Sequence, residues 1–172
     1  MAIRLPLIFL SLVILISANL GFQAWGRIQQ APTGEIWTVT RVLSGQTLMV
    51  KSKAGVIKRL QLQGISAPLK EQEPWGDLAR QRLEQLVKDQ PIILEFDGDQ
   101  QKAKGDRAYL WQGNTLVNAQ LVKEGYVLAD TFASNPKLET LQSEARLLEL
   151  GIWNPENPMR LHPRDFRRQL LR

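Results

Sequence analysis

Residues 60–80 read LQLQGISAPLKEQEPWGDLAR and predict a strand, a turn and the start of a helix. In the strand, alternation with period two puts Leu60 and Leu62 on one face, the expected core face, and Gln61 on the other. An Ala-Pro pair marks the turn. Loops of this kind often display catalytic groups, yet no charged residue occurs from Gln61 through Leu69.

The segments on either side of this stretch predict a mainly β domain. Strand patterns bounded by turn residues indicate a three-stranded meander, then a helix over Asp77–Lys88, two more strands and two further helices. One of these helices is closed by Gly125, and the other runs from Pro136 to a point before Gly151. The order indicates an α+β fold in which a small barrel carries three helices. The predicted strands are Ile36–Leu43, Gln46–Ser52, Val56–Gly64, Pro91–Phe96 and Ala108–Gln112.

Length and composition limit the chemistry that the chain can perform. A length of 172 residues suits one domain with appendages. Because there is no cysteine, disulfides, thiolate metal sites and thiol nucleophiles are excluded, and a single histidine, His162, excludes a multi-histidine metal site. His162 is expected on the surface of an irregular tail. The net charge of +5 fits nucleic acid or an anionic membrane, but equally an ordinary soluble surface.

The N-terminal segment predicts attachment to a membrane. Residues 5–25 read LPLIFLSLVILISANLGFQAW and carry no charge, which is long enough for a helix to cross a bilayer. This run exceeds the apolar region of a usual signal peptide and ends at Trp25, so an uncleaved signal anchor is favoured over a cleaved signal peptide. The folded domain is then expected on the extracytoplasmic or lumenal side of the membrane, as a single-pass protein, or secreted if cleavage occurs.

Three later segments resemble the staphylococcal-nuclease-like (thermonuclease) family. They read WGDLARQRLEQLV, LVNAQLVKEGYV and LQSEARLLELGIW, and they occur in the order of that family's helices. The resemblance implies a five-stranded OB-type barrel with three helices, and cleavage of phosphodiesters with calcium. Together with the uncharged run and the polar stretch after it, the resemblance divides the chain into a signal anchor or transmembrane helix (1–25), a linker (26–34), a nuclease-like domain (35–153) and a basic C-terminal extension (154–172).

The same resemblance locates the family's functional positions in this chain. The calcium-binding aspartates correspond to Gln46 and Ser66, and the glutamate that handles the attacking water corresponds to Leu69. One phosphate-clamping arginine corresponds to Gln61, and the other falls on Gly105 or Asp106. Thr47 alone matches the family pattern among these positions.

These replacements predict loss of the family chemistry. Calcium affinity follows the number of carboxylates, whereas glutamine and serine offer only neutral oxygens. A leucine has no lone pair with which to accept a proton from water. We therefore expect no metal site and no cofactor, and a catalytically degenerate domain that acts as a binding or assembly module, for example an accessory subunit in a membrane protein complex.

Two alternatives of other classes remain open from the residues. The first is an extracytoplasmic calcium-dependent nuclease with a rearranged site, which would draw carboxylates from Glu71, Glu73 and Asp77 and a clamp from Arg107. Arg59 lies on the same strand face as Gln61 but about 7 Å away, too far to make the same contact. The second is a noncatalytic binder of single-stranded nucleic acid that stacks bases on aromatic side chains beside basic ones. Its candidate binding residues are Arg59, Trp75, Arg107, Trp111, Arg164, Arg167 and Arg168.

Overall fold

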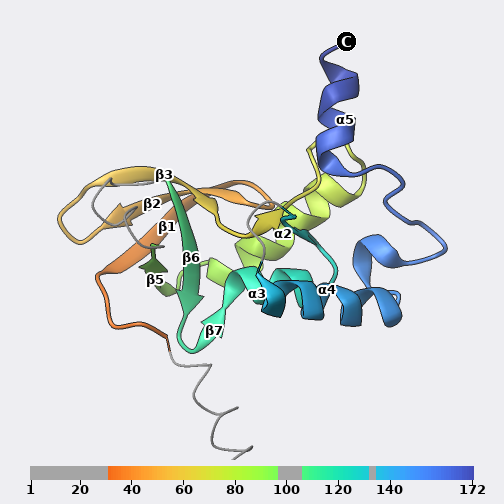
Figure 1. Ribbon diagram of the computed structural model, residues 1–172. Coiled ribbons are helices and arrows are strands. Elements are labelled where there is room, and N and C mark those ends of the chain that lie inside the picture. Colours follow the sequence, from red (N-terminus) through yellow and green to blue (C-terminus); the bar gives the residue numbers. More distant parts are fainter. Residues whose placement is uncertain (1–30, 97–105, 132–134) are drawn as a thin grey trace, which may run out of the picture. The chain divides into compact units, whose positions relative to one another are not determined.

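Five strands close into a barrel (Figure 1): β1 (Ile36–Ser44), β2 (Thr47–Ser52), β3 (Ile57–Leu62), β5 (Pro91–Glu95) and β6 (Arg107–Gln112). Antiparallel pairing joins them in the order β3–β2–β1–β5–β6, and parallel pairing of β3 with β6 closes the ring. The predicted five-stranded barrel is confirmed, and each predicted strand overlaps an observed one.

The computed structural model describes residues 31–96, 106–131 and 135–172, which belong to one compact unit, Ala31–Arg172. The transmembrane helix or signal anchor predicted over residues 1–25 lies outside the described residues, as does most of the predicted linker. Within these three ranges, no helix is both long and apolar enough to cross a membrane.

Alternation along the strands builds the core. Every second side chain of β2 is buried, as are Leu60 and Leu62 on β3, while the residues between them are half-buried or exposed. The predicted core face of Leu60 and Leu62 is therefore confirmed. Burying a leucine or valine side chain contributes about 1.5–3 kcal/mol, so this layer is the main source of stability. The fully or almost fully buried side chains inside the barrel come from β2, β3, β5 and β6; they include Leu48, Val50, Leu60, Leu62, Ile92 and Leu110.

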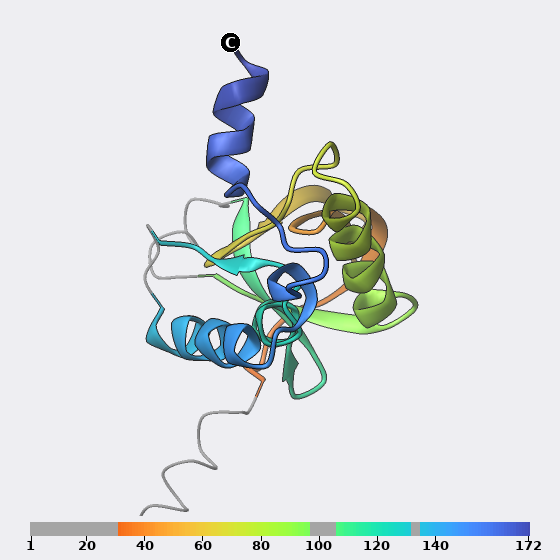
Figure 2. The same cartoon turned by 90° about the vertical axis from the view of Figure 1, so that its right-hand side faces the viewer.

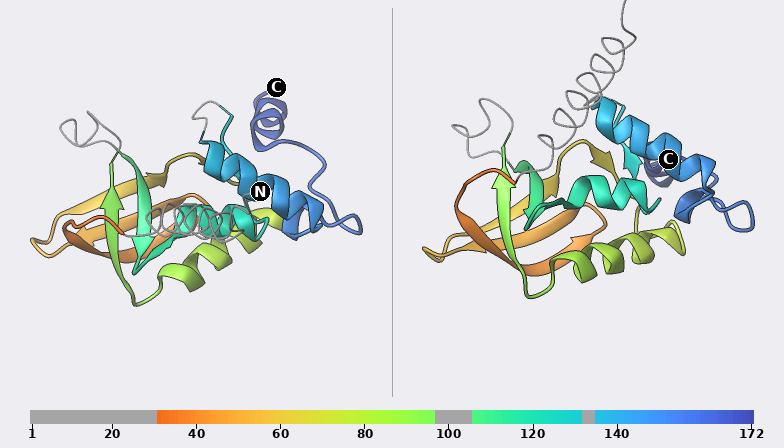
Figure 3. Two further views of the ribbon diagram at one scale, coloured as in Figure 1. Left: turned by 60° about the horizontal axis from the view of Figure 1, so that its bottom comes forward. Right: turned by 90° about the horizontal axis from the view of Figure 1, so that it is seen from below.

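In the described part of the chain four α-helices accompany the barrel: α2 (Trp75–Val87), α3 (Val117–Lys123), α4 (Pro136–Leu147) and α5 (Pro163–Leu170). The first three are the predicted helices, and α3 packs against α4 (Figure 3). Gly125 follows α3 with φ of 72°, as expected of a closing glycine. At α4, the Asn135 side chain accepts hydrogen bonds from two backbone N–H groups and Pro136 occupies the first turn.

Helix α5 corrects the prediction of an irregular tail. His162 is its N-cap, and its Nδ1 accepts a hydrogen bond from the Arg164 N–H at 3.2 Å. Pro163 then starts the helix, which projects away from the barrel in both views (Figures 1 and 2). The segment has no long apolar stripe at helical spacing, so its signals of a helix are limited to the cap, the proline, and the charges of its first and last turns.

A second, smaller hydrophobic cluster joins the C-terminal extension to the domain. It contains Trp75, Leu128 and Ile152, the last in a 3₁₀ turn (Gly151–Trp153), with Met159 packed against it. The Met159 N–H donates to the Ile152 carbonyl at 2.9 Å. The first part of the extension is therefore packed against the barrel domain. Two short pairs complete the fold: β4 (Ile65–Ser66) with β8 (Leu128–Ala129), and β7 (Thr115–Leu116) with β6.

Candidate functional site

The positions implied by the family resemblance meet at one end of the barrel. Gln46 lies in the turn between β1 and β2, and its carbonyl accepts a hydrogen bond from the Leu62 N–H at 2.7 Å. The Gln46 side chain reaches the loop after β4, where its Oε1 accepts from the Ala67 N–H at 2.7 Å. Thr47 is paired in register with Gln61. Residues from three separate segments are thereby brought together.

The start of β6 completes this end of the barrel. The Gln61 N–H donates to the Asp106 carbonyl at 2.6 Å, and Gln61 is in register with Arg107. The side chains of Asp106 and Arg107 are exposed. Gly105, the other position considered for the second arginine, lies outside the described residues. Of the predicted positions, the structure thus brings together Gln46, Gln61, Ser66 and Asp106.

Leu69 is held in place by a residue that the sequence did not point to. Its N–H donates to the Gln72 Oε1 at 3.1 Å, and the Gln72 Nε2 donates to the Leu161 carbonyl at 2.8 Å. The Gln72 side chain is only 7% exposed. The Leu69 carbonyl also lies so close to Gly76 that a Cβ there would overlap it. The loop is therefore fixed from two sides, by the C-terminal extension and by the start of α2.

The residues at this site do not fit a calcium ion. Calcium prefers carboxylates, and the side chains at the two corresponding positions are a carboxamide and a hydroxyl. The carboxamide oxygen of Gln46 is already bonded to a backbone N–H. Within the described ranges, no group of three or more His, Asp or Glu side chains is placed to hold a metal. Glu71, Glu73 and Asp77 are exposed.

The two tryptophans proposed as a stacking surface are buried. Trp75 is 8% exposed and belongs to the second cluster, whereas Trp111 is 7% exposed and its Nε1 donates to the Glu95 Oε2 at 2.7 Å. Neither presents a free face for a base. The stacking role is therefore wrong, and packing explains both residues.

The arginine candidates occupy two different places. Arg59 is exposed on β3, in register with Met49. Arg164, Arg167 and Arg168 all belong to α5, where Arg168 makes an exposed ion pair with Asp165 at 3.3 Å.

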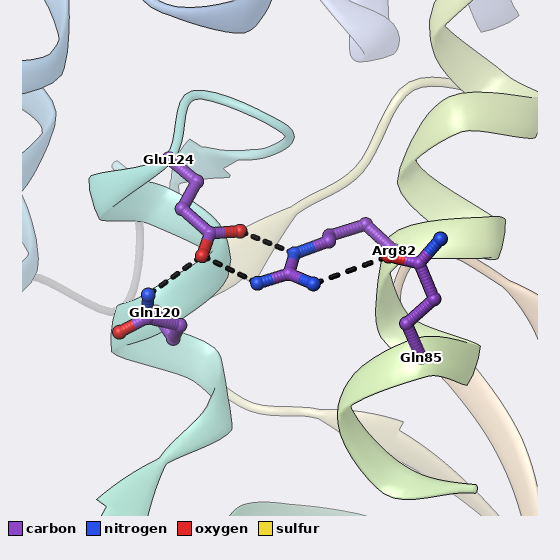
Figure 4. A network of polar contacts seen from close by, with 4 residues as sticks. All are labelled: Arg82, Gln85, Gln120 and Glu124. Carbon is purple, nitrogen blue, oxygen red and sulfur yellow. Dashed lines mark hydrogen bonds and ion pairs between the residues drawn. The ribbon is translucent and has the colours of Figure 1, made fainter.

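An ion pair between α2 and α3 was also not predicted (Figure 4). Arg82 donates twice to Glu124, from Nε at 2.6 Å and from Nη2 at 2.7 Å, and Gln120 donates to the same carboxylate. Partial burial acts to raise the pKa of Glu124, but the hydrogen bonds from Arg82 and Gln120 outweigh it and lower this pKa. The hydrogen bond to Glu124 raises the pKa of Arg82. The pair therefore stays charged at neutral pH and links the two helices.

We expect this pair to make stability depend on pH. Since the Glu124 pKa is lower in the folded chain, its contribution is complete above about pH 4.3, the unfolded value, and is lost as pH falls through the folded pKa. Glu124→Gln should lower the free energy of unfolding by about 1 kcal/mol at pH 7, the upper end for a partly exposed pair.

Urea unfolding at a series of pH values checks this expectation. The difference between the wild type and Glu124→Gln should shrink below pH 4. Glu84→Gln is the matched control, because Glu84 pairs with Arg80 on an exposed part of α2. A difference at Glu124 that stayed constant down to pH 2 would contradict the assignment.

Comparison with known proteins agrees with the fold. Residues 59–155 match the model of the family described as staphylococcal nuclease homologue. The chain is 31% identical to a thermonuclease of Staphylococcus intermedius over 130 residues, covering 70% of this chain and 77% of the relative. It is 28% identical to an uncharacterized endonuclease of Escherichia coli O157:H7 over 123 residues, covering 70% and 78%. On these grounds the chain belongs to the staphylococcal nuclease homologue family.

Proposed function

We propose that this protein is a catalytically degenerate member of its family, tethered to a membrane and acting as a binding or assembly module. The observation that carries the proposal is the hydrogen bond from the Ala67 N–H to the Gln46 Oε1. It joins the two loops that the resemblance assigns to calcium. A neutral side chain therefore holds these loops in place without a cation.

The chemistry at the neighbouring positions supports the same conclusion. Leu69 offers no base, and Gln61 offers a carboxamide where the resemblance implies a guanidinium. Each preorganised donor at a reacting centre is worth about 10²- to 10³-fold in rate, so losing several together removes useful catalysis. The proposed tether rests on the uncharged run of residues 5–25 in the sequence.

A second candidate is a calcium-dependent nuclease with a rearranged site. The names of the relatives favour it, since they include thermonucleases and endonucleases. Such a site would require Glu71, Glu73 or Asp77 to supply carboxylates and Arg107 to replace the lost clamp. In the structure Arg107 does lie in register with Gln61, which is the favourable part of this alternative.

A cleavage assay separates these two functions. We expect purified residues 31–172 to leave plasmid and single-stranded DNA intact in millimolar calcium. Cleavage that a chelator abolishes, and that also disappears in the triple variant Glu71→Gln, Glu73→Gln, Asp77→Asn, would establish the nuclease and overturn the proposal.

Thermal unfolding gives a second readout of the same site. Because a ligand stabilises only a state that binds it, millimolar calcium should leave the wild-type melting temperature unchanged. The double variant Gln46→Asp, Ser66→Asp restores two carboxylates and should gain calcium-dependent stability. A calcium-dependent rise in the wild type would contradict the degenerate site.

A further inference from the structure

The hairpin between β2 and β3 exposes two apolar side chains next to two lysines. Val56 is 50% exposed and Ile57 is 60% exposed. Lys51 is paired in register with Ile57, and Lys53 follows at the start of the turn. We call these four residues, Lys51, Lys53, Val56 and Ile57, the hairpin patch.

The backbone of this hairpin is firmly held. Ser52 is buried, its N–H donates to the Val56 carbonyl at 2.9 Å, and its hydroxyl accepts from the Val56 N–H at 3.3 Å. The Gly55 N–H donates to the Ser52 carbonyl, and Gly55 has φ of 85°, which glycine adopts without strain. The exposed apolar pair is therefore a fixed feature of the surface.

The two strands that carry the patch bear only basic charged side chains, whereas Glu35, two residues before Trp37, is an exposed carboxylate on the segment that enters the barrel beside them. Residues 36–70 contain six lysines and arginines and no aspartate or glutamate. The three described ranges contain no acidic partner for Lys51 or Lys53 within ion-pair distance. Lys58 differs, because its Nζ lies over the rings of Trp37 and Phe96, at 5.7 and 5.9 Å from their centres. Exposed apolar side chains flanked by lysines fit an anionic lipid surface, since the lysines meet headgroups and the apolar groups enter the interface.

The patch lies where the chain enters the barrel. Trp37, near the start of β1, is in register with Ser52 at the base of the hairpin turn. The start of β1 and the β2–β3 hairpin lie close together in Figure 1. The uncharged run ends at Trp25, 11 residues before Ile36, and 11 extended residues reach at most about 40 Å. Helix α5 lies elsewhere: it projects at the top of Figures 1 and 2, whereas residues 31–35 leave at the bottom.

We infer that the hairpin patch contacts the surface of an anionic lipid bilayer. The inference builds on the proposed membrane tether and adds an orientation: the β2–β3 end of the barrel faces the bilayer. Contact between two copies through this patch would place lysines against lysines. Single-stranded nucleic acid would stack on exposed aromatic rings, and the patch contains none.

Vesicle co-sedimentation of residues 31–172 tests the inference, because this unit has its own hydrophobic core and lacks the proposed tether. We expect binding to phosphatidylcholine vesicles that contain phosphatidylglycerol, weakened by salt, and little binding to phosphatidylcholine alone. Lys51→Gln and Lys53→Gln should each lower the partition coefficient about fivefold. The pair Val56→Ser, Ile57→Ser should lower it further.

Two matched controls show whether the effect belongs to this patch. Leu147→Ser with Leu148→Ser removes an even more exposed apolar pair at the end of α4, and Arg167→Gln with Arg168→Gln removes two exposed cations from α5. Both should bind vesicles as the wild type does. The inference is overturned by absence of binding to anionic vesicles, by patch variants that bind normally, or by loss only in the α5 variant. If a single-stranded oligonucleotide competes with vesicles for the wild type, and the lysine variants no longer bind the oligonucleotide, the patch belongs to nucleic acid instead.

Although the inference builds on the proposed tether, the experiment distinguishes its failure from failure of the proposed function. Residues 31–172 lack the uncharged run, so cleavage or absence of the anchor in the full chain does not affect vesicle binding. DNA cleavage by the same preparation would overturn the degenerate site while leaving the lipid contact standing.

Discussion

Replacing Asn118 by alanine is expected to lower the free energy of unfolding by about 3 kcal/mol. Asn118 is fully buried at the start of α3. Its Oδ1 accepts from the Leu110 N–H at 2.9 Å, and its Nδ2 donates to the Gln63 carbonyl at 2.8 Å. Alanine would leave the Leu110 N–H and the Gln63 carbonyl without this partner. Each lost hydrogen bond is expected to cost about 1–3 kcal/mol of stability. Urea unfolding monitored by tryptophan fluorescence measures the loss.

Asn114→Ala is the matched control for this substitution. Asn114 is exposed in the turn between β6 and β7, so its replacement should change stability by no more than about 0.5 kcal/mol. Equal losses at the two positions would show that the Asn118 bonds contribute no net stability. The expected result would instead show that this side chain joins α3 to β6 and to the turn after β3.

The second large effect is expected at Gly125, between α3 and β8. Gly125 has φ of 72°, and a Cβ there would overlap the Leu150 carbonyl. Its own carbonyl accepts from the Ile152 N–H at 2.8 Å. Gly125→Ala should cost about 1 kcal/mol for the left-handed backbone and a further 1–3 kcal/mol for the overlap. The melting temperature and the urea midpoint should both fall.

Gly113→Ala separates the two causes. Gly113 also has positive φ, 54°, but a Cβ at this position would meet nothing within 4 Å. Its replacement should therefore cost only the backbone strain, about 1 kcal/mol. If both variants lost the same stability, the close approach between Gly125 and Leu150 would have relaxed at no cost.

Much of the fold was predictable because it depends on neighbours in the chain. Alternation at Leu60 and Leu62, the helical spacing in α2 and the glycine after α3 are local patterns, and the structure confirms each of them. Helix α5 was missed because a cap and a proline are weak signals without an apolar stripe. For the two tryptophans the sequence allows packing, the favoured interpretation, as well as base stacking, because composition alone does not show which face of an element is covered; their burial agrees with packing.

Part of the site was predictable, but only by resemblance. The family resemblance pointed to Gln46, Gln61, Ser66 and Leu69, and the structure brings the first three together at one end of the barrel. It gave no sign of Gln72, whose two hydrogen bonds fix the loop from Leu69 to the C-terminal extension. A buried glutamine in a polar stretch looks like any solvated residue until its partners are known.

The sequence by itself determined which segments become strands and helices and which faces are apolar, and its resemblance to the family pointed to Gln46 and Ser66 as the positions of the calcium aspartates. Only the tertiary structure decided that Gln46 bonds to Ala67, that Arg82 pairs with Glu124, and that the β2–β3 hairpin lies where the chain enters the barrel. The first two contacts join residues 21 and 42 positions apart, and the third follows from strand register. Such contacts form only when the barrel closes and the helices dock, because the entropy of bringing distant residues together is overcome by burial of the whole core.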